Sequence, residues 1–180
     1  MPDISDIELL QQFRNETTRN TAFNSIVKKY QQKIYYQIRR IVIDHDDAHD
    51  VVQNTFIKVW KGLDNFREDS QLFTWMYRIA TNESITFLKQ KKSKIHISFD
   101  EVEYDLVSHL DGNPNFKGDI IQMKLQQAIL TLPAKQRLVF NMKYFDDMKY
   151  EEMEKVLGTS VGALKASYHH AVKKIEKFLT

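Results

Sequence analysis

Histidine, cysteine and the carboxylates are the side chains that most often catalyse reactions or bind metals, and their arrangement in this chain favours no reaction. The 180 residues include six histidines and no cysteine, which excludes a thiolate metal site and a disulfide. The H-E-x-x-H motif of zinc hydrolases is absent, and the adjacent His169 and His170 cannot bind one ion from one side of a helix. The phosphate-binding patterns G-x-x-x-x-G-K-S/T and G-x-G-x-x-G are absent too. We therefore expect no catalytic residue, no metal site, no cofactor and no enzymatic activity.

DNA binding is the chemistry that the C-terminal residues favour. Tyr150–Leu157 and the stretch from Val161 to about Leu179 read as two helices joined by a short turn, which is the helix-turn-helix pattern. Gly158 supplies a left-handed turn residue, and Ser160 can cap the second helix and leave its N-terminal amides facing a phosphate. Small residues at the start of the outward face permit close approach to base edges, and polar and basic residues follow. This face comprises Gly162, Ala163, Lys165, Ala166, His169, His170 and Lys173. An ordinary helical hairpin would have the same spacing.

Charge is unevenly distributed along the chain. Residues 1–94 carry 15 Lys and Arg against 12 Asp and Glu, a balance of +3, and residues 121–180 carry ten against six, a balance of +4. Residues 95–120 carry one against six, a balance of −5, so that the whole chain has a net charge of +2. Two basic blocks around an acidic segment suit a polyanionic partner, although solvated helix faces have a similar composition.

Nothing in the sequence indicates export or membrane insertion. The N-terminal MPDISDIELLQQF has no basic region and no apolar core of signal-peptide length. No stretch approaches the roughly 18 apolar residues of a membrane-spanning helix. We therefore expect no integral membrane segment and a cytoplasmic location.

Helices are the elements that must position these side chains. The chain has only five Gly and three Pro, and its apolar residues recur every three or four positions. A capping box at Ser5–Glu8 and the acidic cluster Asp44–Asp47, a plausible cap, mark two helix starts, and Gly62 can end the second of these helices. The predicted fold is all-α, with two small helical domains at residues 1–93 and 120–180 joined by an acidic linker at 94–119. The C-terminal domain contains the helix-turn-helix.

Three longer stretches resemble the extracytoplasmic-function sigma factors, which direct bacterial RNA polymerase to promoters. DDAHDVVQNTFIKVW at Asp46–Trp60 is similar to region 2.2 of the family. FREDSQLFTWMYRIATNESITFLKQKK at Phe66–Lys92 is similar to regions 2.3 and 2.4, and Leu132–Ile175 is similar to region 4. The resemblance covers roughly residues 20–180, in the family's order and spacing. It implies an alternative sigma factor that binds core polymerase and initiates transcription at specific promoters through their −10 and −35 elements.

The resemblance implies a polymerase-binding surface on the region 2.2 helix, which in the family docks on the clamp coiled coil of the largest polymerase subunit. The candidate contacts are Asp47, Asp50, Gln53 and Phe56, spaced three residues apart. Carboxylates can pair with basic groups of the partner, and an aromatic ring can anchor the edge. Phe56 can equally be a core residue. His49 and Asn54 stand where the family usually has Glu, so this face is less acidic than is typical.

The resemblance also implies that regions 2.3 and 2.4 open the −10 element and hold a flipped-out base. Melted DNA needs stacking surfaces for its bases and cations for its phosphates. The candidate contacts are Asn65, Phe66, Arg67, Ser70, Trp75, Arg78, Asn82, Lys89 and Lys92. Trp75 also suits the core at its helical position. Glu68 and Asp69 are unfavourable beside DNA unless they accept a hydrogen bond.

Region 4 of the family reads the −35 element in the major groove, which would use Ser160 and the outward face defined above. The chain has Ser167, His170 and Val172 where the common family pattern has arginines. Each missing phosphate contact should lower the affinity for DNA and reduce its salt dependence by about one unit of slope. We therefore expect weak binding of duplex DNA by the isolated chain.

Two other functional classes fit parts of the sequence. A stand-alone helix-turn-helix regulator would explain residues 120–180 but would leave Asp46–Trp60 and the aromatic loop at Phe66–Tyr77 without a role. A helical protein-interaction module would bind neither polymerase nor DNA. If the family resemblance holds, the partners are core RNA polymerase, promoter DNA and an anti-sigma factor.

Overall fold

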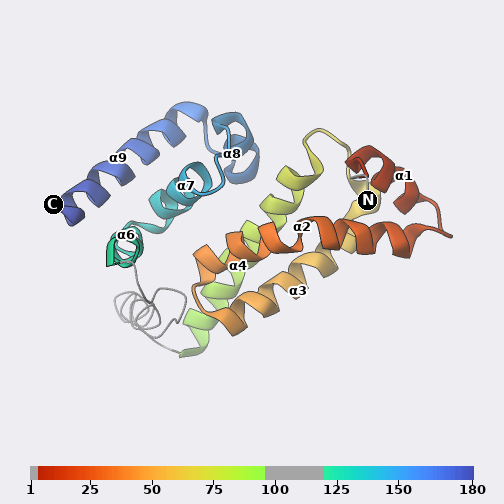
Figure 1. Cartoon of the computed structure of the whole chain (residues 1–180), viewed down its shortest axis with the longest axis horizontal. Helices are drawn as coiled ribbons and strands as arrows, with labels where there is room; N and C mark the ends of the chain where they lie inside the picture. The colour runs from red at the N-terminus through yellow and green to blue at the C-terminus, as the bar shows by residue number, and fades with distance from the viewer. Residues whose placement is uncertain (1–3, 96–119) are drawn as a thin grey trace. The chain divides into compact units, whose positions relative to one another are not determined.

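The computed structural model describes residues 4–95 and 120–180, and within these ranges all regular structure is helical (Figure 1). The prediction of an all-α fold is therefore confirmed. The chain divides into two compact units between Phe87 and Leu88. Most of the predicted linker, residues 96–119, lies outside the described residues.

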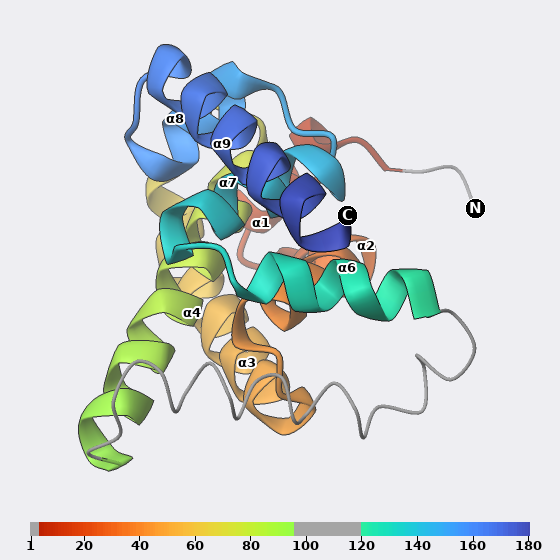
Figure 2. The ribbon, with the colours of Figure 1, turned by 90° about the vertical axis from the view of Figure 1, so that its left-hand side faces the viewer.

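Four α-helices and one 3-10 turn lie between Asp6 and Ile95. They are α1 (Asp6–Arg14), α2 (Arg19–Val42), α3 (His45–Gly62), η1 (Leu63–Asn65) and α4 (Leu72–Ile95). The long helices α2 and α3 lie side by side in both ribbon views (Figure 1 and Figure 2). Apolar residues at helical spacing on α1, α2, α3 and α4 are buried, and the largest fully buried side chains include Leu9, Phe13, Ile26, Ile34 and Tyr77.

Short side chains cap the first and third helices, as predicted. The hydroxyl of Ser5 accepts a hydrogen bond from the amide of Glu8 at 3.3 Å, and the Glu8 carboxylate accepts one from the Ser5 amide at 3.0 Å. This capping box satisfies amides that have no partner within the helix. The hydrogen bonds from Ser5 lower the pKa of the Glu8 carboxyl. Asp44 caps α3 by accepting from the amide of Asp47 at 2.9 Å.

Gly62 ends α3, but not through a left-handed turn. Its φ of −94° is one that any residue adopts. The glycine instead leaves room for the indole of Trp75, because a β-carbon at Gly62 would lie 3.1 Å from that ring, closer than most such contacts. The sequence predicted Gly62 as a glycine C-cap, whereas the structure shows it at a close contact between α3 and α4. The local sequence does not reveal that contact.

A buried polar contact joins α2 to α4. The side-chain amide of Gln37 donates to the backbone carbonyl of Tyr77 at 2.9 Å and to the hydroxyl of Thr81 at 2.8 Å. All three residues are buried. Since a buried amide without a partner is costly, these bonds favour one register of α4 against α2.

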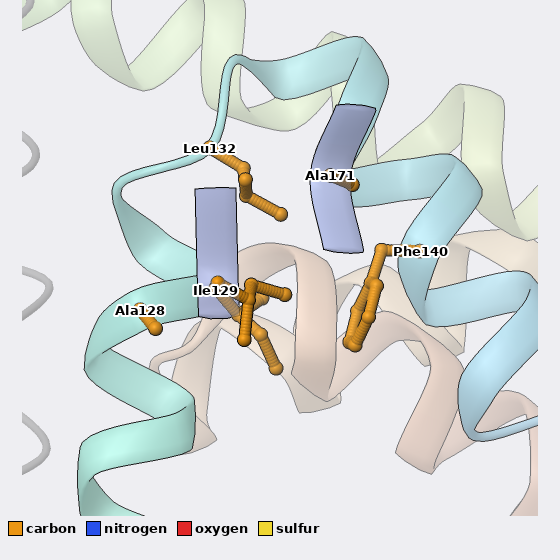
Figure 3. Packing of buried hydrophobic residues seen from close by; sticks show 6 residues of the cluster. Ala128, Ile129, Leu132, Phe140 and Ala171 are labelled. Atoms are coloured by element: carbon orange, nitrogen blue, oxygen red, sulfur yellow. The ribbon is translucent and has the colours of Figure 1, made fainter. Parts of the chain in front are cut away.

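The C-terminal unit contains four described helices, α6 (Ile120–Leu130), α7 (Ala134–Tyr144), α8 (Tyr150–Leu157) and α9 (Val161–Leu179). Its core cluster comes from α6, α7, α9 and the turn after α6, and is formed by Ala128, Ile129, Leu132, Phe140, Ala171 and Ile175 (Figure 3). Gly158 adopts φ 61°, and its amide donates to the carbonyl of Glu154 at 2.8 Å. The predicted left-handed turn between α8 and α9 is thus confirmed, and these helices form the helix-turn-helix.

Candidate functional site

The outer face of α3 presents three of the four predicted polymerase contacts. Asp50 and Gln53 are exposed and Asp47 is half-buried, whereas Phe56 is only 8% exposed and its ring meets that of Phe23 at a centroid distance of 6.5 Å. Because an α-helix has about 3.6 residues per turn, steps of three drift around it and reach the buried side by the fourth residue. The structure therefore places Phe56 in the core.

Ile57 is the apolar residue on this outer face, and the sequence-based set missed it. It is 46% exposed and lies four positions after Gln53 and seven after Asp50, on the same side of α3. An exposed isoleucine beside carboxylates and an amide combines an apolar anchor with a polar rim. The available signal was the helical period itself, counted from Asp50 and not from Phe56.

The loop between η1 and α4 has a buried side and an exposed side. Phe66 is 7% exposed and packs on Trp75 with ring centroids 5.0 Å apart. Asn65 and Arg67 are exposed and Ser70 is half-buried. The two aromatic rings therefore hold the loop against α4 and leave the polar side chains facing solvent.

One row of polar side chains runs along α4 from this loop. Arg78, Asn82 and Lys89 are exposed and lie on the side of the helix that carries Trp75. Arginine, asparagine and lysine side chains donate hydrogen bonds to phosphate oxygens. Lys92 belongs to α4, but its side chain lies outside the described residues.

The second helix of the helix-turn-helix separates a buried face from an exposed one. Leu164, Ala171 and Ile175 are buried, whereas the predicted DNA-facing residues Gly162, Ala163, Lys165, Ala166, His169, His170 and Lys173 are all exposed. The Ser160 hydroxyl accepts from the amide of Ala163 at 3.4 Å, which confirms the predicted cap. A β-carbon at Gly162 would meet no atom within 4 Å, so the start of α9 is open to a ligand.

Tyr150 links the two helices of this motif, and sequence reasoning missed it. The ammonium groups of Lys165 and Lys143 each lie 5.7 Å from the centre of the Tyr150 ring, within the range of cation–π attraction. Tyr150 is half-buried at the start of α8. Its ring therefore restrains a lysine on the exposed face of α9. Burial raises the pKa of the nearby Tyr168 phenol, which favours its neutral form.

Two sequence patterns associated with enzymes, H-x-x-x-H and G-x-S-x-G, occur in the chain. His45 and His49 are spaced as H-x-x-x-H, with ring centroids 4.5 Å apart and Tyr35 Oη 2.7 Å from His45 Nδ1. Within residues 4–95 and 120–180, no three His, Cys, Asp or Glu side chains are grouped to hold a metal ion. Gly158–Gly162 matches G-x-S-x-G, but Ser160 caps a helix there.

No described helix is long and apolar enough to cross a bilayer.

Comparison with known proteins matches both units of the chain. The model of sigma-70 region 2 matches residues 26–94, and the model of sigma-70 region 4 matches residues 122–175. The RNA polymerase sigma-H factor of Pseudomonas aeruginosa is 32% identical over 168 residues, which cover 88% of this chain and 86% of the relative. The ECF RNA polymerase sigma factor SigW of Bacillus subtilis is 30% identical, covering 88% and 89%. The chain belongs to the extracytoplasmic-function sigma factors.

Solved structures of sigma factors have the same fold. The sigma factor RpoE of Bartonella quintana, crystallised with the anti-sigma factor NepR, has a TM-score of 0.69 at 21% identity and covers 87% of this chain and 96% of its own. CnrH, in complex with the cytosolic domain of CnrY, has a TM-score of 0.68 at 22% identity, covering 96% and 95%.

Membership of this sigma family defines the function of the chain. It is an alternative sigma factor that binds core RNA polymerase and directs transcription initiation at promoter DNA. Sigma factors are initiation factors, not enzymes. A stand-alone helix-turn-helix regulator is not favoured, because it would leave the region 2 match unexplained.

Proposed function

We propose that this sigma factor binds its partners through three exposed surfaces. The outer face of α3 binds core polymerase, the loop at 65–71 with α4 binds the −10 element, and α9 binds the −35 element. One observation carries the proposal. In each matched region, polar or basic side chains line one helix face while the opposite face is buried.

The polymerase surface consists of Asp47, Asp50, Gln53 and Ile57. The carboxylates attract basic groups of the clamp coiled coil of the largest polymerase subunit, while Ile57 loses its contact with water on docking. Phe56 supports the surface from beneath by packing against Phe23.

The −10 surface begins at the loop, where Asn65, Arg67 and Ser70 contact a flipped-out base and its neighbours. Hydrogen bonds to the edge of such a base need polar side chains on a fixed backbone. The packing of the Phe66 ring on Trp75 of α4 holds the backbone of the loop in place. The basic and amide row on α4 follows the phosphates of the opened strand, and we assign Arg78, Asn82, Lys89 and Lys92 to it.

The −35 surface is the exposed face of α9, with the capped N-terminus of the helix directed at a phosphate. Gly162, Ala163 and Ala166 leave room for base edges, and Lys165 and His169 extend toward them. His170 and Lys173 reach the backbone, with Ser160 at the helix start.

We assign residues 1–93 to the domain that binds polymerase and the −10 element, 94–119 to a linker, and 120–180 to the −35 domain. The family matches at 26–94 and 122–175 support this division.

Because the partner polymerase is cytoplasmic, we also propose a cytoplasmic location. The two solved neighbours are complexes with the anti-sigma factor NepR and with CnrY, and we propose that an anti-sigma factor likewise restrains this chain.

Gel filtration with bacterial core RNA polymerase tests the polymerase surface. The chain should co-elute with core, and an Asp50→Ala/Gln53→Ala variant should not. A Glu16→Ala/Gln31→Ala variant is the control, since it removes one carboxylate and one amide from exposed positions elsewhere in the same unit. Equal loss in both variants, or co-elution of both, would contradict the assignment to α3.

A further inference from the structure

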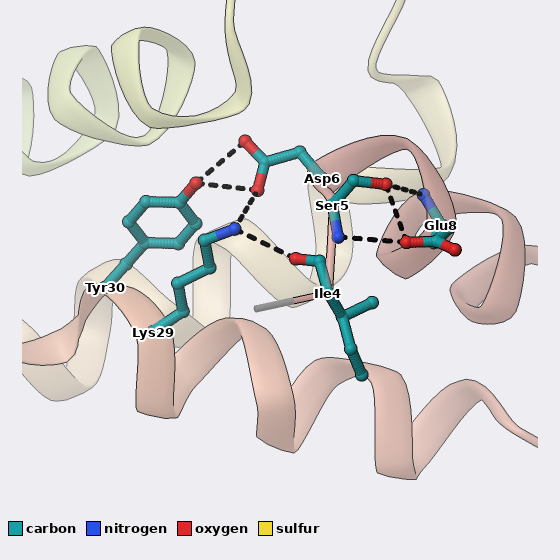
Figure 4. A network of polar contacts seen from close by, with 6 residues as sticks. All are labelled: Ile4, Ser5, Asp6, Glu8, Lys29 and Tyr30. Carbon is teal, nitrogen blue, oxygen red and sulfur yellow. Dashed lines mark hydrogen bonds and ion pairs between the residues drawn. The ribbon is translucent and has the colours of Figure 1, made fainter. Parts of the chain in front are cut away.

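The first helix lies outside the region 2 match, yet it is firmly fixed to the matched part. Residues 4–25 precede the match at 26–94. At the start of α1, the Tyr30 hydroxyl donates to the Asp6 carboxylate, with both oxygens 2.7 Å away, and Lys29 Nζ lies 3.1 Å from Asp6 Oδ1 (Figure 4). Lys29 also donates to the backbone carbonyl of Ile4 at 3.0 Å. These contacts fix the N-terminal end of α1 on α2.

The other end of α1 reaches the proposed −10 loop. Leu9, Leu10 and Phe13 are buried, so α1 is part of the core and not a loose arm. From its last residue, Arg14 Nη2 donates to Glu68 Oε1 at 2.7 Å, across 54 residues of sequence. The helix therefore joins the loop directly to α2.

A second arginine holds the start of the loop. Arg19, the first residue of α2, pairs with Asp64 in η1. Its guanidinium also lies 4.3 Å from the centre of the Phe13 ring and 5.1 Å from that of Trp60. An arginine within cation–π distance of two aromatic rings has few alternative positions, so it restrains Asp64 more than an isolated surface ion pair would.

These two pairs explain acidic residues that are otherwise unfavourable beside DNA. Asp64 and Glu68 would repel phosphates if their charges were free, and each is matched by an arginine. Glu68 also has φ 59°, a left-handed conformation that is strained for a residue with a β-carbon. A contact that holds Glu68 in this conformation also sets the path of the residues beside it.

We propose that Arg14 and Arg19 are positioning residues that lock Asp64 and the loop at 65–71 in a base-reading conformation and thereby set the base preference at the −10 element. The proposal rests on the assignment of this loop to the −10 element. The Arg14–Glu68 pair is half-exposed, with 51% and 45% of the two side chains accessible. Such pairs shift an equilibrium by about fivefold at most. The expected effect is therefore a broadened base preference and not a loss of initiation.

A charge swap separates loop positioning from general electrostatics. The variants are Arg14→Glu, Glu68→Arg and the double Arg14→Glu/Glu68→Arg, with Lys28→Glu as a control for charge at an exposed position of α2. Each is bound to core polymerase and used to select promoters from a library randomised at both the −10 and the −35 positions. Both single variants should broaden selection at the same position by about two- to fivefold, and the double variant should restore it. Glu68→Arg is the most informative variant, because its added positive charge should raise the affinity for DNA while the base selectivity at the −10 element falls.

Amide hydrogen exchange of the free chain tests the lock without polymerase. Exchange at residues 64–71 should quicken in both single variants and return toward the original rate in the double variant, with the buried parts of α2 and α3 unchanged. Unaltered exchange, or single variants that keep the original base profile, would overturn the proposal. Faster exchange combined with a base profile that is lost at the −35 and not at the −10 positions would instead refute the assignment of the loop.

Discussion

Phe56 and Ile57 are neighbours in α3, but Phe56 faces the core and Ile57 is exposed. Replacing Phe56 with alanine should lower the free energy of unfolding by about 3 kcal/mol, because a buried ring is lost from the core. Replacing Ile57 with aspartate should change stability by less than about 0.5 kcal/mol but weaken core polymerase binding about tenfold. Chemical denaturation and core titration measure the two quantities. If Ile57→Asp leaves core affinity unchanged, Ile57 is only a surface residue.

We expect Tyr150 to influence DNA recognition through Lys165, whose ammonium group lies 5.7 Å from the centre of its ring. Tyr150→Leu removes the ring that attracts the lysine, and an exposed cation–π contact of about 0.5–1 kcal/mol corresponds to a two- to fivefold loss of −35 discrimination. Tyr150→Phe keeps the ring and should keep the discrimination. Competition between promoters with altered −35 elements, measured with the polymerase complex, tests this difference. Equal behaviour of the Leu and Phe variants would exclude positioning by the ring.

At the scale of the element, the turn between α8 and α9 depends on the backbone of one residue. Gly158 has φ 61° and no atom would meet its β-carbon within 4 Å, so the cost of a side chain there is conformational and not steric crowding. Gly158→Ala should therefore destabilise the C-terminal unit by about 1 kcal/mol, and Gly158→Asn by less. Gly162→Ala is the matched control, because Gly162 lies in a helix with open space around it. Thermal unfolding that is equally affected by both alanines would contradict this reading of the turn.

At the scale of the whole molecule, we expect the −35 surface to bind DNA weakly by itself and to rely on the rest of the chain. Ser167, His170 and Val172 provide no arginine along α9. The free chain should therefore bind −35 duplex DNA poorly, with a shallow dependence on salt, and bind promoters tightly only with core polymerase. Fluorescence anisotropy at several salt concentrations measures both states. Nanomolar binding by the free chain with a steep salt slope would contradict the expectation.

Much of the architecture was determined by local sequence signals. Ser5, Asp44 and Ser160 cap helices where their sequence context predicts, and Gly158 adopts the expected left-handed turn. These features follow from short-range hydrogen bonds and backbone sterics, which a few adjacent residues specify. Apolar periodicity likewise indicated the helices, because each must bury one face.

The tertiary structure alone decided which candidate residues are exposed and which contacts link distant segments. Phe56 and Phe66 are buried, while Ile57 is exposed. Residues spaced three apart rotate gradually around a helix, so their spacing alone does not show which of them face the core. Gly62 serves the packing of Trp75, and Arg14 reaches Glu68 across 54 residues. Such contacts depend on how the helices pack against one another, which no local pattern encodes. Family membership and most helices could therefore be predicted from local sequence, whereas helix packing decides which side chains are exposed and able to bind a partner.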